Sequence, residues 1–227
     1  FLTYQLVIAD SDGNNPHVLV KQKYNPIATP TFSADGKQLA YVSYVKNTMA
    51  VYIISLATGS NHLVANFPGI NSAPAFSPDG KYLALGLSKG SGSKVDLFLY
   101  NLKNKQFKQL TKIGTNTSPS FSPSGKELLF TSNRSGRAQI YKLNLATKKV
   151  TRITYQGRQN LDAKFLPDGK NILMMHQSES GGSIRIAIMN LKNNKLRVIT
   201  DGQTDKSPAA SPNGQMILYL QLGGGVS

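Results

Sequence analysis

The chain contains no cysteine and no tryptophan among its 227 residues, and only 11 acidic residues stand against 26 lysines and arginines. The absence of cysteine excludes disulfide bonds and thiolate metal ligands, and it permits an oxidising compartment without demonstrating one. No apolar run approaches the ~20 residues that a membrane-spanning helix needs, so no membrane insertion is expected. The opening stretch FLTYQLVIADSDG reads as a strand and a turn. We therefore expect any export leader to lie upstream or to have been removed.

What the chain has in abundance is one recurring turn. The stretch FSPDGKYLALGLS at residues 76–88 has near copies at 32–43, 121–132, 165–176 and 210–220. Successive turn glycines are separated by 44, 45, 44 and 45 residues; they are Gly36, Gly80, Gly125, Gly169 and Gly214. A fixed period of this size is typical of a repeat architecture, and without a linker-like stretch it predicts one domain over residues 1–227.

Each repeat reads as four short antiparallel strands without a candidate helix. In the repeat at 72–112 we expect strands at 72–76, 81–87, 95–100 and 106–110, with a loop at 89–94. Ser77-Pro78-Asp79-Gly80 supplies the turn chemistry, because proline presets φ and glycine accepts a positive φ. Four strands in about 44 residues predict an all-β fold, a β-propeller, in which stacked blades cover each other's apolar faces. The alternative is an open β-solenoid or a sandwich array.

The two ends of the chain do not coincide with the ends of blades. Residues 4–22 resemble the last two strands of a repeat, and residues 206–221 resemble the first two. The pattern therefore predicts four full blades and two half-blades. Either the halves join into one shared blade or both have lost neighbours, and the abrupt end at residues 223–227 favours a truncated chain.

The formal net charge of +15 can indicate nucleic-acid binding, an acidic partner or an anionic membrane surface. Nucleic-acid readers usually cluster their basic residues, often beside aromatic ones. Here the lysines recur at equivalent turn positions, at Lys37, Lys81, Lys126 and Lys170. We therefore expect no nucleic-acid partner, and favour a solvated basic rim that attracts acidic protein surfaces.

Candidate catalytic and metal motifs lack their required context. Residues 86–90 (GLSKG) match the G-x-S-x-G nucleophile elbow, but that motif needs a strand-to-helix turn and here another strand follows. The three histidines, His17, His62 and His176, show no zinc spacing. The turn at Asp10–Gly13 lacks the distant glutamate of a calcium loop. We expect no catalytic residue, no metal and no cofactor.

The unit x-P-x-F-S-P-D-G-K-x-L resembles the repeat of TolB-type (PD40) propellers, whereas the lack of tryptophan fits WD repeats poorly. More specific are SNRSGRAQIYK at 132–142 and RITYQGRQN at 152–160, which are similar, in this order, to stretches of the TolB family. The likeness covers essentially the whole chain.

This resemblance implies a six-bladed propeller in the family and a periplasmic, monomeric protein of the Tol–Pal system, which serves envelope integrity, cell division and protein transport. It also implies that the propeller face binds the peptidoglycan-associated lipoprotein Pal and, in some bacteria, colicins. The family's N-terminal α/β domain has no counterpart in these 227 residues. The resemblance therefore does not extend to TolA, which the family binds through its N-terminus.

The resemblance also implies where a partner binds. If the strands of a blade are named A to D, contacts in such propellers lie on the loops from strand D to the next strand A. These D–A loops are Asn25–Thr29, Gly69–Ala73, Gly114–Ser118, Arg158–Asp162 and Thr204–Ser207. The candidate contact residues are Asn71, Ser72, Ala73, Asn116, Thr117, Gln159, Asn160, Asp162 and Asp205. The alternative is that such residues only cap strand ends and satisfy loop backbone.

A second functional hypothesis is a gating propeller of a prolyl-oligopeptidase-type peptidase. Its catalytic domain would then lie outside this chain.

Overall fold

Twenty β-strands make up all the regular structure of residues 2–45, 48–88 and 94–222, the ranges that the computed structural model describes. Sixteen of them form four antiparallel blades. Blade 1 contains β3 (Ile27–Phe32), β4 (Gln38–Val45), β5 (Thr48–Ser55) and β6 (Asn61–Ala65); blade 2 contains β7 (Asn71–Phe76), β8 (Tyr82–Leu87), β9 (Asp96–Asn101) and β10 (Phe107–Gln109). Blade 3 contains β11 (Asn116–Phe121), β12 (Glu127–Ser135), β13 (Arg137–Asn144) and β14 (Val150–Arg152); blade 4 contains β15 (Gln159–Phe165), β16 (Asn171–Gln177), β17 (Ile184–Asn190) and β18 (Leu196–Val198).

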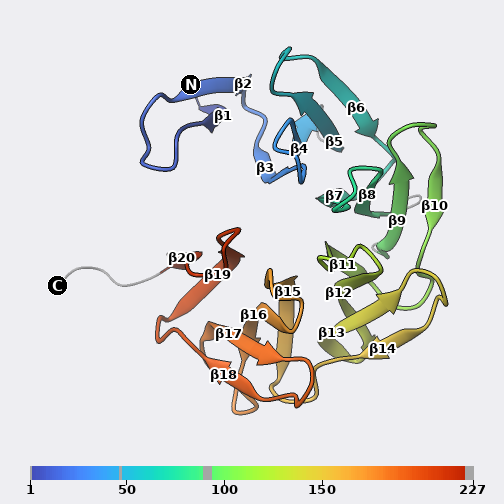
Figure 1. The fold of residues 1–227 in the computed structure, drawn as a ribbon, viewed down its shortest axis with the longest axis vertical. Helices are drawn as coiled ribbons and strands as arrows, with labels where there is room; N and C mark the ends of the chain where they lie inside the picture. Colours follow the sequence, from blue (N-terminus) through green and yellow to red (C-terminus); the bar gives the residue numbers. More distant parts are fainter. Residues whose placement is uncertain (1, 46–47, 89–93, 223–227) are drawn as a thin grey trace.

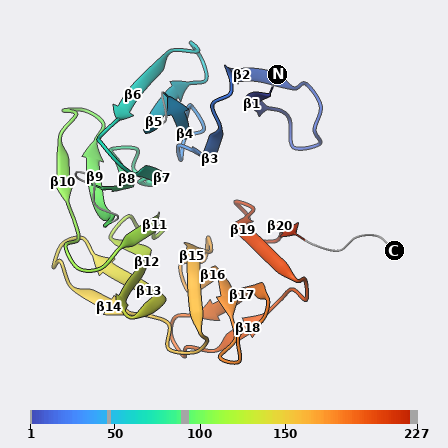
Figure 2. The ribbon, with the colours of Figure 1, turned by 180° about the vertical axis from the view of Figure 1, so that it is seen from behind.

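The blades are arranged radially around a shared axis, and the first strand of each blade lies innermost (Figures 1 and 2). The predicted β-propeller of four full blades is therefore confirmed, and the solenoid and sandwich alternatives are wrong. The strands predicted for blade 2 agree with the observed bounds to within one residue at each end. Of the loop predicted at 89–94, residues 89–93 lie outside the described ranges.

Two half-blades complete the described chain. β1 (Thr3–Ile8) and β2 (His17–Lys23) pair only with each other, as a C–D hairpin. β19 (Thr204–Ala210) and β20 (Ile217–Leu222) form an A–B hairpin, which one parallel pair, Ile184 with Thr204, joins to blade 4. Both predicted half-blades are thus present, and in the described ranges they do not pair into one shared sheet. Residues 223–227 lie outside these ranges.

Alternating side chains of the inner strands pack against opposite neighbouring blades. In β8, Leu83, Leu85 and Leu87 join a cluster with blade 1, whereas the intervening Ala84 joins a cluster with blade 3. All four are at most 1% exposed. Because strand side chains alternate between faces, a sheet that is covered on both faces reads as a continuous apolar run. The core therefore lies between blades, and each buried leucine contributes about 1.5–3 kcal/mol.

By contrast, β20 exposes apolar side chains that the equivalent strand β8 buries. Leu218 is 76% exposed and Leu220 is 52% exposed. In the described chain β20 has only β19 as a hydrogen-bonded neighbour. The two faces of β8 are covered by blades 1 and 3, whereas no apolar cluster among the described residues includes a side chain of β20, which explains the difference.

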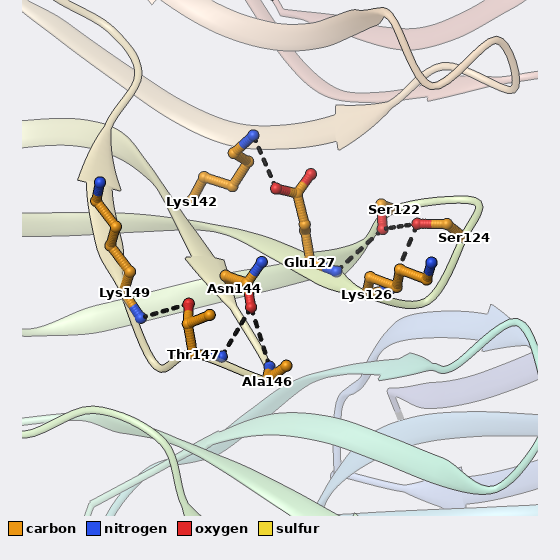
Figure 3. A network of polar contacts seen from close by, with 9 residues as sticks. All are labelled: Ser122, Ser124, Lys126, Glu127, Lys142, Asn144, Ala146, Thr147 and Lys149. Carbon is orange, nitrogen blue, oxygen red and sulfur yellow. Dashed lines mark hydrogen bonds and ion pairs between the residues drawn. The ribbon is translucent and has the colours of Figure 1, made fainter.

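The turns between strands A and B are held by side chains that the sequence motif specifies. Ser77 donates its hydroxyl to Asp79 Oδ1 at 2.7 Å, and its Oγ accepts the Tyr82 N–H at 2.9 Å. Gly80 closes the turn with φ of 66°, as predicted. Figure 3 shows the equivalent turn of blade 3, where Ser122 Oγ accepts the Glu127 N–H at 3.1 Å. The recurring turn therefore fixes where each strand B begins.

Replacing Ser77 by alanine should lower the free energy of unfolding by about 1–2 kcal/mol, because the Tyr82 N–H loses a buried acceptor. The Ser77 hydroxyl also holds the pKa of Asp79 below its ordinary value of 3.8. A lowered pKa stabilises the fold above that ordinary value, and this contribution is lost as the pH falls through the folded-state pKa. The gap in stability between the wild type and the variant should therefore narrow under acid conditions.

Urea unfolding at pH 7 and pH 3, with an NMR titration of Asp79, measures both effects. Ser124→Ala is the matched control, since this exposed turn serine bonds no carboxylate. Its Oγ lies 3.1 Å from Ser122 Oγ and accepts a long bond from Lys126 N at 3.4 Å. An unchanged Asp79 pKa in Ser77→Ala would contradict the assignment.

Candidate functional site

The D–A loops gather around the axis at one face of the ring. Each D–A connection runs inward to the start of β3, β7, β11, β15 or β19, the innermost strands in Figure 1. The predicted loop bounds were too long: all nine candidate residues lie in the first residues of strands A, and Thr204–Ser207 lies wholly within β19. Antiparallel pairing places the B–C loops on this same face and the A–B and C–D turns on the opposite one. The structure separates the nine predicted contact residues into four that are buried and five that are partly exposed.

The buried asparagines fasten the loops to the scaffold. Asn71 is fully buried, and its Nδ2 donates to Phe67 O at 2.7 Å and to Met49 O at 3.0 Å. Its Oδ1 accepts the Phe67 N–H at 3.1 Å. Phe67 belongs to the loop itself, whereas Met49 belongs to strand C of the preceding blade. The Asn71 side chain thus satisfies backbone N–H and C=O groups that have no backbone partner within the loop.

Asn116 and Asn160 repeat this arrangement with additional partners. Arg134 donates to Asn116 Oδ1 at 2.9 Å, and its guanidinium lies 4.8 Å from the centre of the Tyr141 ring. Asn160 Nδ2 donates to Gln139 Oε1 of the preceding blade at 2.8 Å. These side chains are fully buried. Any contribution that they make to binding would therefore act through the loop that they position.

His176 contacts the same loop of blade 4. Its Nδ1 lies 2.8 Å from Asn160 Oδ1, and burial lowers the pKa of the imidazole below its usual value. A neutral ring with the proton on Nδ1 donates to that oxygen. Gly157 makes the contact possible, because a Cβ there would collide with the ring and lie 2.7 Å from Gln177 O. His176 and Gly157 were not among the predicted residues.

Asp205 occupies the position of these asparagines but lacks their partners. It is fully buried, and neither carboxylate oxygen has a hydrogen-bond partner among the described residues. Gly202 permits its approach, since a Cβ there would collide with Asp205 Oδ1 and Gln221 Nε2. Without an NH₂ group, the carboxylate cannot donate to loop carbonyls as Asn71 does.

The five partly exposed candidates, Ser72, Ala73, Thr117, Gln159 and Asp162, lie on the inner strands next to the buried positions. Among the described residues, the side chains of Ser72, Ala73 and Thr117 make no hydrogen bond or ion pair. Asp162 forms an ion pair with Lys164 at 2.8 Å, and its N–H donates to Thr131 Oγ1 of blade 3 at 3.0 Å. Gln159 Nε2 donates to Gln177 Oε1 at 3.0 Å. These residues are the accessible part of the candidate surface.

A backbone bulge recurs beside these residues in every strand A. The pairing register skips two residues of the inner strand, for example Ala73 and Pro74 between Ser72 and Ala75. At the skipped position five non-glycine residues have φ between 47° and 52°; they are Thr29, Ala73, Ser118, Asp162 and Ser207. Such a conformation costs about 1–2 kcal/mol for an L-residue. Such strain persists only where the surrounding structure holds it, so the bulge is a fixed feature of each strand A.

The residues of the other sequence motifs make local hydrogen bonds. Ser88, the serine of the G-x-S-x-G match, is 1% exposed, and its Oγ accepts the Ile70 N–H at 2.6 Å. Lys89 and Gly90 of that motif lie outside the described residues. At the first turn, Asp12 accepts bonds from Asn14 at 2.8 and 3.0 Å. Within the described ranges, no group of three or more His, Asp or Glu side chains is placed to hold a metal ion.

A ring of four-stranded antiparallel blades, with loops from successive blades around the axis at one face, defines a β-propeller. The family model described as the TolB beta propeller domain matches residues 2–227. This chain therefore belongs to the TolB β-propeller family. Among its described residues, no helix is long and apolar enough to cross a membrane.

Two curated relatives are named Tol-Pal system protein TolB. The protein of Francisella tularensis subsp. mediasiatica is 44% identical over 219 residues, which cover 96% of this chain and 50% of that protein. The protein of Xylella fastidiosa is 41% identical over 226 residues, which cover 99% and 51%. The crystal structure of TolB from Acinetobacter baumannii matches with a TM-score of 0.90 at 35% identity, over 97% of this chain and 55% of that chain. The chain thus spans about half the length of its curated relatives.

Replacing Asp205 by asparagine should raise the free energy of unfolding by about 1–3 kcal/mol at neutral pH. The new NH₂ group can donate to carbonyls of its D–A loop, whereas the buried carboxylate has no partner among the described residues. The reciprocal change Asn160→Asp removes the donor to Gln139 and should destabilise by a similar amount. Urea unfolding of both variants measures this, and a less stable Asp205→Asn variant would show that the carboxylate is satisfied.

Proposed function

We propose that this chain is the propeller of a periplasmic, non-catalytic scaffold in the Tol–Pal envelope system. Its D–A loop face would dock the lipoprotein Pal. Membership of the TolB family supports the assignment to the Tol–Pal system, because the curated relatives are named Tol-Pal system protein TolB. The absence of cysteine is compatible with a periplasmic location. The observation that carries the docking site is the set of loops fixed by Asn71, Asn116 and Asn160.

Fixed loops favour binding because little conformational entropy is lost when the partner arrives. Each of these asparagines bonds its own loop and the preceding blade, so the surface is set before binding. The partly exposed residues beside them are small or polar, at Ser72, Ala73 and Thr117. Small side chains leave room for an inserted partner loop to reach hydrogen-bonding groups. A colicin segment that docks in the same way would compete with Pal.

The double variant Ser72→Leu with Thr117→Ile tests this proposal in the full-length protein. Added bulk at two neighbouring loops should weaken binding of the soluble Pal domain of the same organism at least tenfold, about 1.4 kcal/mol. Ala73 is left unchanged, because φ of 50° would strain a branched side chain at that position. Isothermal titration calorimetry measures the affinity.

The control variant Ser124→Leu with Thr147→Ile adds similar bulk to exposed turns on the opposite face. It should bind Pal like the wild type. If the loop variant keeps its unfolding temperature and its wild-type affinity, docking on the D–A loop face is wrong.

A further inference from the structure

Beside the candidate loops of blade 4 lies a pocket of 390 Å³, whose arginines come from the stretches 132–142 and 152–160. Its walls come from three connections on the same face of the ring. They are the B–C hairpin of blade 3, the segment that follows β14, and the B–C loop of blade 4. The pocket therefore lies between two blades and next to Gln159, one of the predicted contact residues.

Basic side chains dominate this pocket. Arg137, Arg152 and Arg158 line it together with a single acidic residue, Glu179. Among the described residues none of the three arginines forms an ion pair. Arg137 and Arg158 are exposed, and neither guanidinium group has a hydrogen-bond partner within the described ranges. Each guanidinium carries five N–H donors in a planar fork, so most of the donor capacity of the pocket is available.

The third arginine is held in place. Arg152 Nε donates to Thr154 O at 2.6 Å, and its guanidinium lies 4.9 Å from the centre of the Tyr155 ring. The Tyr155 side chain is 66% exposed, which leaves an aromatic surface beside the charge. An arginine that is already oriented loses less entropy when it binds a carboxylate.

The base of the pocket is rigid and carries no compensating charge. Gln139 is 3% exposed, and its Nε2 donates to Gly157 O at 3.3 Å. Its Oε1 accepts Thr154 Oγ1 at 2.6 Å and Asn160 Nδ2 at 2.8 Å. Through these bonds Gln139 ties the pocket to the loop that Asn160 positions, and a ligand of the arginines would lie against the docking face.

We propose that this pocket, the arginine pocket, binds carboxylate side chains of an acidic segment of the protein that docks on the D–A loop face. The inference rests on the proposed function and adds the chemistry of the partner. Paired arginine and carboxylate groups form bidentate, charge-assisted hydrogen bonds. A nucleic-acid strand would instead need a basic groove that continues along its backbone, and this pocket is a single confined site. The net charge of +15 would also steer an acidic partner toward the chain.

The double variant Arg137→Glu with Arg158→Glu tests the proposal in the full-length protein. Arg152 is left unchanged because its Nε bonds Thr154 O in the segment that follows β14. Binding of the soluble Pal domain should weaken at least tenfold, and the salt dependence of the remaining affinity should become flatter. The control Lys126→Glu with Lys149→Glu changes the net charge equally on exposed turns of the opposite face, where Figure 3 shows both lysines. It should weaken binding no more than threefold.

If the wild type binds Pal and both double variants weaken it equally, the arginine pocket is not a specific site and the inference fails while the proposed function stands. If neither the wild type nor the control binds Pal, the proposed function fails. The pocket is then tested with an oligoglutamate peptide and a single-stranded oligonucleotide of equal charge. Binding of the peptide that Arg137→Glu with Arg158→Glu abolishes supports the carboxylate site. Loss of oligonucleotide binding alone overturns it.

Discussion

The packing of alternate strand side chains against opposite neighbours is the interaction on which the rest of the structure depends. A blade such as blade 2 has no apolar face that it can bury alone, since Leu83 and Ala84 point to different neighbours. Each blade is therefore stable only between two others, as in other repeat proteins. This requirement holds every strand A at the axis. It also explains why β20, which lacks such surroundings in the described chain, exposes Leu218 and Leu220.

Because the blades are fixed by their neighbours, polar side chains can link one blade to the next at the loop face. Asn71 reaches Met49 and Asn160 reaches Gln139, in each case across a blade boundary. Such buried bonds stabilise little in themselves, but leaving one unmade is expensive. The main effect of the asparagines is therefore to favour one loop conformation over others. The recurring bulge is compatible with the same view, because strain near Ala73 persists only where the surrounding structure determines it.

The blades were predictable from the sequence because one turn motif repeats with a constant spacing. Even where the motif changes, the turn persists: Leu166 replaces the serine of blade 4, and Asn171 bonds Asp168 instead. The site was only partly predictable. The sequence implied that the candidate residues lie close to the D–A loops. The burial of Asn116, however, depends on the neighbouring blade. The positive φ at Thr29 or Ser118 carries no glycine signal. The arginine pocket joins residues 137, 152 and 158 from separate elements, a grouping that only the fold produces.

The D–A loops of the ring also differ in the buried side chains that link them to the blades. The positions equivalent to Asn71 are spaced by 44 and 45 residues, and they hold Ile27, Asn71, Asn116, Asn160 and Asp205. Only the three asparagines can both donate to the loop and accept from it. Ile27 offers neither group, and the carboxylate of Asp205 has no partner in the described chain. The preorganised part of the face is thus the arc from blade 2 to blade 4. Since the arginine pocket lies at the last blade boundary within this arc, the rigid loops and the excess positive charge lie next to each other.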